Sequence, residues 1–314
     1  MMALRTAVIG VGHLGRHHAR LLATMPGVTL VAAVDPVIDR ARAAVDQTPA
    51  QAVADVAEIH DQIDAAVVAV PTRDHLRVAS ALLERGVHVL VEKPMAPSLD
   101  EADDMIRIAA RSGAVLAVGH TERFNPAVKA ALSVLQTPRF IEVHRLSGFP
   151  ERSLDIDVVF DVMIHDLDII LAVNKTDVVS VEAIGVNVLT DRIDIANARI
   201  KFASGCIANL TASRISRDKI RKLRCFQRDM YVSVDYAEQE LEVWRLRPRP
   251  GERPAIEGGP IKVDREEPLR CELQDFVESI QSGRAPGVPG ADGRRALSLA
   301  TAVAAAIGEN GAHP

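Results

Sequence analysis

The chain has few residues that could cross-link it through disulfide bonds or metal ions. Its three cysteines, Cys206, Cys225 and Cys271, lie far apart and form neither a CxxC motif nor a cluster with histidine. Zinc sites and disulfide frameworks both depend on grouped cysteines in recognisable spacings. The cysteine pattern therefore indicates neither of them, and it fits a protein of the reducing cytoplasm.

Long apolar runs are also missing. No stretch approaches the roughly 18 uninterrupted apolar residues that a membrane span requires. The short apolar run after Arg5 stops at Gly10 and has no small-residue cleavage site behind it. It therefore predicts a first strand rather than a signal peptide. We expect a soluble protein.

The chain lacks an excess of positive charge. The formal net charge is -5, so no basic field favours nucleic acid or an anionic membrane as a partner. The 314 residues are 48% hydrophobic and 25% charged, which is ordinary for a globular protein with a buried core. The length suggests two domains.

The first part of the chain has the pattern of a Rossmann-like parallel sheet. Apolar runs without polar alternation are separated by segments typical of helices, as expected when helices cover both faces of the sheet. We predict a dinucleotide-binding domain over residues 1–121. Its strands are expected at Thr6–Gly10, Thr29–Val34, Ala65–Val70, Val87–Glu92 and Val115–Gly119.

The remainder, residues 122–314, is predicted to form a second α/β domain. An apolar helix over Val158–Val173 is followed by several strands in succession, which favours a large, mostly antiparallel sheet. We expect an exposed connection over Arg247–Pro268 and closing helices at Leu269–Ser282 and Ala291–Ile307. The strands are expected at Val178–Val188, Ile195–Phe202, Cys206–Arg214, Lys222–Gln227 and Met230–Leu246.

A GxGxxG motif follows the first strand directly and opens a helix. Gly10 suits the tight turn, Gly12 allows the backbone to approach a pyrophosphate, and Gly15 allows close packing of helix on strand. The amides of the turn, which includes His13 and Leu14, and the positive end of the helix would receive the phosphates. These residues are the candidate cofactor cradle.

An acidic residue at the end of the second strand favours NAD over NADP. Asp35 follows Gly15 by twenty residues, where its carboxylate can accept hydrogen bonds from a ribose hydroxyl and would repel a 2′-phosphate. Arg40 and Arg42 could instead reach toward such a phosphate, or they could be solvated charges on a helix face.

Two further strand ends are candidates for the cofactor site. The third expected strand is broken sharply at Pro71, so that Thr72 and His75 lie at the carboxyl edge of the sheet and are candidates to contact the cofactor. The alternative is a simple strand-to-helix turn capped by Thr72. The fourth strand ends in Glu92 and Lys93.

The ammonium of Lys93 stands at the end of an interior strand, where it is partly removed from water. This position suits proton transfer or the binding of a substrate hydroxyl, and Pro94 biases Lys93 toward an extended backbone. The alternative is an exposed ion pair between Lys93 and Glu92.

The apolar helix in the second domain carries one polar stripe. At 100° per residue, Asp161, His165 and Asp168 fall within about 60° of one another. The two carboxylates can fix the tautomer of the histidine and support it as a base. Asp166 points away from this stripe and is expected at the surface.

Other chemistries have less support from the sequence. The stripe lacks the second histidine typical of zinc helices, so no metal is expected. The chain contains no GxSxG motif and no cysteine in a reactive setting, which would indicate nucleophilic catalysis.

Taken together, these motifs resemble the glucose-fructose oxidoreductase, inositol dehydrogenase and rhizopine catabolism (Gfo/Idh/MocA) family. The resemblance runs nearly end to end. It is carried by Gly10-x-Gly12-x-x-Gly15, Glu92-Lys93-Pro94, Asp161-x-x-x-His165-x-x-Asp168, Glu267-Pro268-Leu269 and Gly290-x-Asp292-Gly293. It implies a Rossmann domain, a second domain with a large open sheet, and homo-oligomers, dimers or tetramers, built on that sheet.

The resemblance also implies roles for individual residues. It makes Lys93 and His165 the catalytic pair and Asp161 a ligand of the substrate hydroxyl. The chain departs from the family where Asp155-Ile156-Asp157 replaces a pair of glycines upstream of Asp161.

The segment that begins at Gly119 is similar to the branch of the family that acts on nucleotide-activated amino sugars. This branch includes enzymes of lipid A precursor synthesis that oxidise the 3-hydroxyl of UDP-N-acetylglucosamine. By this resemblance Arg123, Phe124 and Asn125 are candidate substrate-binding residues, with Arg123 on the diphosphate. The alternative for Phe124, a place in the core, is the favoured one.

Two other functions stay open. One is an inositol or free-sugar dehydrogenase. The other is a non-catalytic NAD-binding regulator on the same fold, against which the presence of both Lys93 and His165 argues. The main expectation is an NAD-dependent dehydrogenase that acts on a sugar or nucleotide-sugar hydroxyl.

Overall fold

The computed structural model describes residues 3–60, 62–149, 156–250 and 253–310. The chain divides into two compact units. The first unit comprises residues 1–121 and 267–294, and the second comprises residues 122–266 and 295–314. Segment 267–294 was expected in the second domain. It belongs to the first because helix α7 (Pro268–Ser282) buries Leu273 and Phe276 in the core of that unit.

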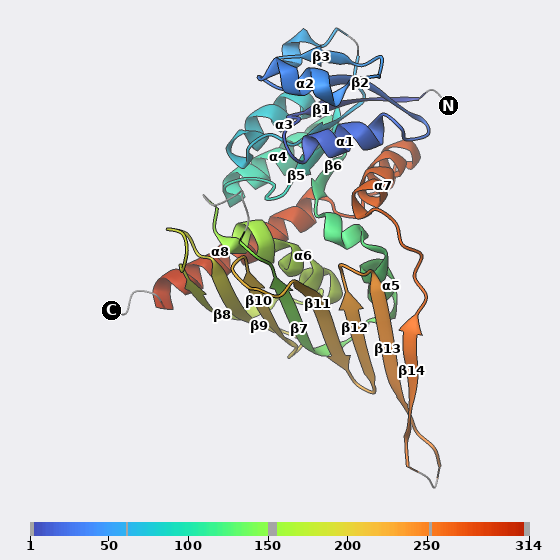
Figure 1. The fold of residues 1–314 in the computed structure, drawn as a ribbon, viewed down its shortest axis with the longest axis vertical. Helices are drawn as coiled ribbons and strands as arrows, with labels where there is room; N and C mark the ends of the chain where they lie inside the picture. Colours follow the sequence, from blue (N-terminus) through green and yellow to red (C-terminus); the bar gives the residue numbers. More distant parts are fainter. Residues whose placement is uncertain (1–2, 61, 150–155, 251–252, 311–314) are drawn as a thin grey trace. The chain divides into compact units, whose positions relative to one another are not determined.

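The first unit is built on a parallel sheet, as expected, and this sheet has six strands (Figure 1). Its strand order, β3-β2-β1-β4-β5-β6, is that of a doubly wound α/β fold. The strands are β1 (Leu4–Ile9), β2 (Val28–Val34), β3 (Gln51–Val53), β4 (Ala65–Val68), β5 (His88–Glu92) and β6 (Leu116–Gly119). Only the short edge strand β3 was not expected.

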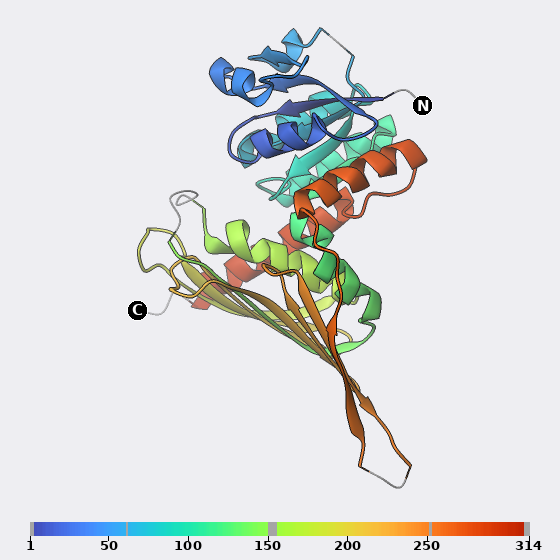
Figure 2. The same cartoon turned by 45° about the vertical axis from the view of Figure 1, so that its right-hand side comes forward.

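Helices cover both faces of this sheet, which explains the lack of polar alternation in its strands. Helix α1 shares a core with α2 and α7, and α3 packs against α4 (Figure 2). The bounds of these elements are α1 (Gly15–Leu22), α2 (Ile38–Ala44), α3 (His75–Leu83) and α4 (Leu99–Ser112), with short 3-10 turns η1 (Val56–Glu58) and η2 (Thr72–Asp74).

The second unit contains an eight-stranded sheet in the order β14-β13-β12-β11-β7-β10-β9-β8. All neighbours are antiparallel except β7 and β10. This confirms the expected mostly antiparallel sheet. The strands are β7 (Pro138–Leu146), β8 (Val178–Val186), β9 (Ile195–Phe202), β10 (Ile207–Ser213), β11 (Ile220–Gln227), β12 (Met230–Asp235), β13 (Glu240–Arg247) and β14 (Ala255–Ile261).

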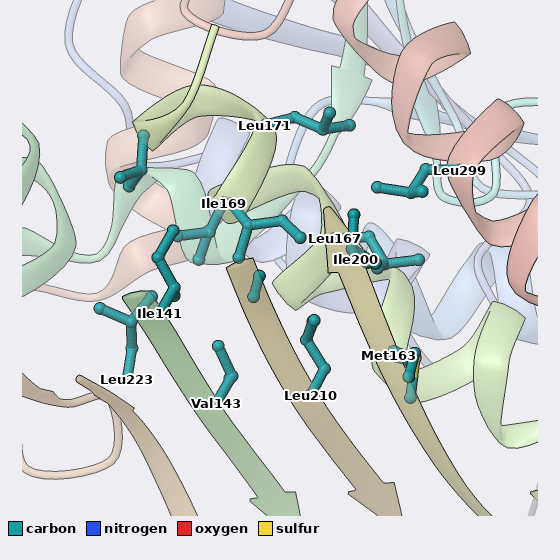
Figure 3. Packing of buried hydrophobic residues seen from close by; sticks show 14 of the residues in the cluster. Ile141, Val143, Met163, Leu167, Ile169, Leu171, Ile200, Leu210, Leu223 and Leu299 are labelled. Atoms are coloured by element: carbon teal, nitrogen blue, oxygen red, sulfur yellow. The ribbon is translucent and has the colours of Figure 1, made fainter. Parts of the chain in front are cut away.

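Helices cover one face of this sheet (Figure 2). They are α5 (Pro126–Val134), α6 (Ile164–Val173), which follows a π-helical turn η4 (Val159–Met163), and the later part of α8 (Gly290–Asn310). A short turn η3 (Thr121–Phe124) precedes α5. Figure 3 shows apolar side chains of α6, such as Leu167 and Ile169, over strand residues Ile141, Val143 and Leu210.

Three expectations for this unit need correction. Strand β7, at the centre of the sheet, was not expected. The segment Met230–Leu246 is two strands joined by a tight turn in which Gln239 has a positive φ of 51°. The connection expected over Arg247–Pro268 contains the edge strand β14, which pairs with β13.

Among the described residues, no helix combines the length and the apolar character needed to cross a membrane.

Candidate functional site

The glycine turn between β1 and α1 is shaped by close backbone contacts. Gly10 has a φ of +85°, and a Cβ atom there would lie 2.7 Å from the carbonyl oxygen of Ala69. A Cβ atom on Gly15 would lie 1.8 Å from the carbonyl oxygen of Gly10. By contrast, a Cβ atom on Gly12 would meet open space. The turn therefore needs two glycines for its own packing, and it leaves the backbone at Gly12 accessible to a ligand.

The beginning of α1 suits an anion. Leu14 precedes the helix and supplies no side-chain cap, and the first turn of α1 contains no acidic residue. Both Leu14 and His13 are exposed. Accessible amides at the positive end of a helix form a ready site for a phosphate group, so the expected cradle fits the pyrophosphate of a dinucleotide.

Asp35 lies at the end of β2 and is buried. Its carboxylate accepts hydrogen bonds from the amides of Val11, at 3.2 Å, and Val37, at 2.9 Å. The guanidinium of Arg40 approaches to 3.9 Å, whereas Arg42 pairs with Asp39 on the exposed face of α2. The carboxylate is thus fixed beside the glycine turn, where it can also accept from a ribose hydroxyl.

Pro71 and Thr72 follow β4 and begin the turn η2. Pro71 is exposed and Thr72 is half-buried. Thr72 does not cap α3, because the residue before that helix is Asp74. Since β2, β1, β4 and β5 are neighbours in a parallel sheet, their carboxyl ends share one edge. That edge brings Gly10–Gly15, Asp35, Thr72 and Lys93 to the same side of the first unit.

His75 lies in the interior of the first unit, with both ring nitrogens directed at the backbone. It is buried, and burial lowers its pKa although hydrogen bonds to the backbone oppose the shift. Its Nε2 lies 2.9 Å from the carbonyl oxygen of Val70, and its Nδ1 lies 3.1 Å and 3.3 Å from those of Pro94 and Met95. Because both ring nitrogens face backbone carbonyls, contact with a cofactor is not supported.

Glu92 is buried and pairs with a buried histidine of the first helix. Its Oε1 lies 2.7 Å from Nε2 of His18, on α1, and its Oε2 accepts from the amide of Lys93 at 3.2 Å. Burial alone raises the pKa of Glu92, but the hydrogen bond and charge of His18 outweigh it and hold the pKa below its ordinary value. The alternative of an exposed ion pair between Glu92 and Lys93 is therefore wrong, because Glu92 is buried and contacts His18.

A second buried carboxyl, Glu272 on α7, lies near Glu92. Its Oε1 accepts a hydrogen bond from the hydroxyl of Thr121 at 3.1 Å. Burial, followed by the negative charge of Glu92, raises the pKa of Glu272 well above its ordinary value. Gly119 gives Glu92 room, because a Cβ atom there would lie 3.0 Å from Glu92 Oε2.

In the second unit, Asp161 and His165 are half-buried on consecutive helical segments. Asp161 lies in the π-helical turn, in which the amide of Ile164 donates to the carbonyl of Val159, five residues back. The angle expected from a continuous α-helix therefore does not apply to Asp161. Upstream, Asp155 lies outside the described residues, and Asp157 Oδ1 accepts from the amide of Ile193 at 3.0 Å.

Asp166 is fully buried, so its expected position at the surface is wrong. Both of its carboxylate oxygens accept hydrogen bonds of 2.8 Å from Arg145 on β7. Arg145 also donates to Glu122 at 2.8 Å and stacks 4.9 Å above the ring of Tyr236. Burial alone lowers the pKa of Arg145, but the carboxylates of Asp166 and Glu122 reverse the effect and raise it.

Asp168 is also buried, and Arg123 holds it. Arg123 Nε donates to one carboxylate oxygen at 2.9 Å, and Nη2 donates to the other at 2.6 Å. The side chain of Arg123 is only 12% exposed. This guanidinium is therefore engaged inside the protein, which does not support its expected contact with a diphosphate.

Phe124 and Asn125 are both buried in the second unit. Phe124 is buried, as its alternative placement in the core predicts. Asn125 is buried, caps α5 by accepting from the amide of Ala127 at 3.1 Å, and donates to the carbonyl of Tyr236 at 2.9 Å. Substrate binding by these two side chains is not supported by their burial.

The expected site residues thus fall into two groups. The first unit holds the glycine turn, Asp35, Thr72 and Lys93 at one sheet edge, and the second unit holds Asp161 and His165. Arg145 gave no signal in the sequence, and the partner of Arg123 could not be foreseen, since an isolated arginine gives no sign of a partner 21 or 45 residues away.

The comparisons with known proteins agree with this geometry. Residues 4–120 match the model of the Gfo/Idh/MocA oxidoreductase family with an NAD-binding Rossmann fold, and residues 137–249 match the model of the C-terminal domain of that family. The UDP-N-acetylglucosamine 3-dehydrogenase of Acidithiobacillus ferrooxidans is 36% identical over 98% of both chains. Its solved structure matches with a TM-score of 0.90, again over 98% of both chains.

A more distant relative is named for a polyol substrate. The scyllo-inositol 2-dehydrogenase of Bacillus subtilis is 26% identical over 92% of this chain and 90% of its own. Both relatives are named as dehydrogenases, and the matched N-terminal model is NAD-binding. The chain belongs to the Gfo/Idh/MocA family of NAD-binding oxidoreductases.

Proposed function

We propose that the protein is an NAD-dependent dehydrogenase that oxidises the 3-hydroxyl of a UDP-N-acetyl amino sugar, with UDP-N-acetylglucosamine as the substrate. The near full-length relationship to the Acidithiobacillus ferrooxidans enzyme supports the substrate. The accessible backbone at Gly12, the uncapped start of α1 and the fixed carboxylate of Asp35 support the cofactor.

One observation carries the assignment of catalytic residues. The stretch from Val158 to Val173 contains four titratable side chains, and only Asp161 and His165 remain half-exposed. Asp166 and Asp168 are withdrawn into ion pairs with arginines. A histidine that remains accessible on an otherwise buried helix is suited to proton transfer rather than to packing.

In the proposed reaction, His165 takes the proton from the ring hydroxyl, and Asp161 accepts a hydrogen bond from the sugar. Lys93 holds the reacting oxygen as a hydrogen-bond donor. NAD, when bound, supplies the acceptor for the hydride that leaves the ring carbon. The products are then a 3-keto sugar, reduced cofactor and a proton that His165 returns to solvent.

The test is a turnover assay at the absorbance band of reduced nicotinamide, with NAD and a panel of UDP-sugars and polyols. An aminotransferase that consumes the 3-keto product would draw the reaction forward. Turnover confined to a UDP-N-acetyl amino sugar would support the proposal. Turnover confined to inositols or free sugars would contradict it.

A second candidate, an inositol or free-sugar dehydrogenase, is favoured by a specific observation. Arg123, the residue expected to pair with a diphosphate, is already bound to Asp168. The scyllo-inositol 2-dehydrogenase relative shows that the family includes this activity. Calorimetric binding of UDP alone separates the two, because only a nucleotide-sugar enzyme has a site for it.

We also propose that the protein is a homo-oligomer assembled through the bare face of the eight-stranded sheet. Cross-strand pairing aligns a row of four aromatic side chains across β7, β11, β12 and β13: Phe140, Phe226, Tyr231 and Trp244. In a chain with only 3% aromatic residues, this concentration on an uncovered face is typical of an interface.

The cytoplasmic location and the supply of lipid A precursors, both expected from the sequence, stay predictions.

A further inference from the structure

Two buried histidines flank the turn that carries Lys93. His18 contacts Glu92, the residue immediately before Lys93, and His75 contacts the carbonyls of Pro94 and Met95, which follow it. Both histidines are at most 1% exposed. Neither side chain is therefore available to a ligand at the surface.

Each histidine links this turn to another segment of the expected dinucleotide site. His18 projects from α1, the helix that begins at the glycine turn. His75 binds the carbonyl of Val70 at 2.9 Å, next to Pro71 and Thr72 at the end of β4. The contact of His18 is with the residue before Lys93, and the contacts of His75 are with Val70 and with the two residues after Lys93. The two histidines therefore connect the Lys93 turn to two different segments, helix α1 and the end of β4.

The link through His18 runs through a single contact. Within the described part of the chain, Nδ1 of His18 has no hydrogen-bond partner. The imidazole of His18 is therefore held by the hydrogen bond between its Nε2 and Glu92. Glu92 in turn accepts from the backbone amide of Lys93. A buried, partly unsatisfied imidazole is costly, so its contact with Glu92 must offset part of that cost.

We propose that His18 and His75 are positioning residues that hold the Lys93–Pro94 turn in register with the dinucleotide cradle, His18 through Glu92 and His75 through two backbone carbonyls. The inference rests on the proposed role of Lys93 at the substrate hydroxyl. It assigns to His75 a function in place of the cofactor contact expected from the sequence, and it adds His18 to the functional residues.

Amide substitutions test the two histidines without introducing apolar side chains. A glutamine amide nitrogen lies near the position of Nε2 of histidine, whereas an asparagine nitrogen lies near Nδ1. His18→Gln should therefore keep the bond to Glu92, and His18→Asn should lose it. At position 75 neither amide spans both sets of carbonyls, so both variants should be impaired. His60→Asn, at an exposed histidine of the same unit, is the matched control.

The first readout needs no substrate. The rate of reductive methylation of Lys93 in the full-length protein, measured by mass spectrometry against the exposed Lys129, reports the surroundings of the Lys93 amine. We expect this ratio to change in His18→Asn and in both His75 variants, and to stay near wild type in His18→Gln and His60→Asn. An unchanged ratio in all variants would overturn the proposal.

The second readout is kinetic. In His18→Asn we expect kcat to fall by about a hundredfold, the loss that a misplacement of about 1 Å can cause, while the KM for the sugar changes little. His18→Gln should regain most of the activity, and an equally impaired His18→Gln would also overturn the proposal. If wild type oxidises no UDP-sugar or polyol, the proposed function fails, and the methylation ratio still decides the positioning role.

Discussion

Arg123 binds the carboxylate of Asp168 through two parallel hydrogen bonds, from Nε to Oδ2 at 2.9 Å and from Nη2 to Oδ1 at 2.6 Å. Because both side chains are largely buried, removing one partner leaves an uncompensated charge. We expect Asp168→Asn to lower the free energy of unfolding by about 3–5 kcal/mol, measured by urea denaturation. Arg42→Met, in the exposed pair with Asp39, should cost at most about 1 kcal/mol.

The double variant Arg123→Met/Asp168→Leu distinguishes a structural pair from a ligand site. It should recover much of the stability that Asp168→Asn loses, since apolar residues can replace a buried ion pair. A selective loss of UDP affinity in Arg123→Met, with stability intact, would instead restore the diphosphate role of this arginine.

Asp35 should control the choice of cofactor. In Asp35→Ala the ribose hydroxyl loses a charged acceptor, a bond worth about 1.5–3 kcal/mol, so NAD affinity should fall by about tenfold to a hundredfold. NADP binding should hold or improve because the repulsion of its 2′-phosphate is removed. Titration of both reduced cofactors by fluorescence measures this, with Asp39→Ala as the control. Equal losses for the two cofactors would exclude the role.

His165 should be essential for the chemical step and dispensable for cofactor binding. General-base catalysis contributes about 10²–10⁴ in rate, and His165→Ala should reduce kcat by that factor. The affinity for NADH should stay within about twofold of wild type, because the cradle lies in the first unit. His60→Ala, an equal truncation at an exposed position, should keep its activity. A nearly active His165→Ala enzyme would refute the assignment.

Glu272 should make stability depend on pH. Its pKa is raised, first by burial and then by Glu92, so the folded chain keeps a proton that the unfolded chain releases above about pH 4.3. This difference costs stability as the pH rises. Glu272→Gln keeps the acceptor for Thr121 without titrating, and it should therefore unfold at a higher temperature than wild type near neutral pH.

The increase in unfolding temperature of Glu272→Gln over wild type should become smaller as the pH falls toward the ordinary pKa of a glutamate. There, Glu272 is protonated in the unfolded chain too, so folding no longer changes its protonation. Thermal unfolding followed by circular dichroism at several pH values measures it. Glu278→Gln, at an exposed glutamate of the same helix, is the control. A gain that does not vary with pH would show that Glu272 is ionised in the folded protein.

In the proposed oligomer, the aromatic row on the sheet should form the contact between subunits. Phe226→Glu places a charge in its centre and should shift sedimentation toward the monomer, because an unpaired charge in an apolar interface is costly. Phe149→Glu adds the same charge at an exposed phenylalanine outside the strands. An unchanged sedimentation coefficient for Phe226→Glu would exclude this face as the interface.

The first unit could be predicted closely from the sequence because its buried parallel strands are uninterrupted apolar runs with glycine or proline at their ends. The shared position of the candidate residues Gly10–Gly15, Asp35, Thr72 and Lys93 at one sheet edge could be predicted for the same reason, since their motifs occupy strand ends whose order the fold dictates. His18 and Glu272 could not be found this way, because their partner Glu92 lies 74 residues from His18 and comes near only through the fold.

In the second unit, strand β7 escaped prediction for a physical reason. Its inward-facing positions include Ile141, Val143 and Arg145, and the arginine interrupts the alternation of apolar side chains. Asp166 was misplaced because a lone carboxylate on a helix gives no sign of the arginine that neutralises it. Strand β14 escaped because an exposed edge strand with Gly258, Gly259 and Pro260 has the composition of a loop.

The π-helical turn at Val159–Met163 carries Asp161 one extra residue along the backbone before the regular helix that bears His165. Deleting one residue here would convert the π-helical turn into regular α-helix. The position of Asp161 would then rotate by about 100° around the helix axis. The core-packed remainder of α6 would be untouched. Because Asp161 is proposed to contact the sugar, a one-residue deletion in this turn should alter the substrate preference while the core contacts of α6 stay in place.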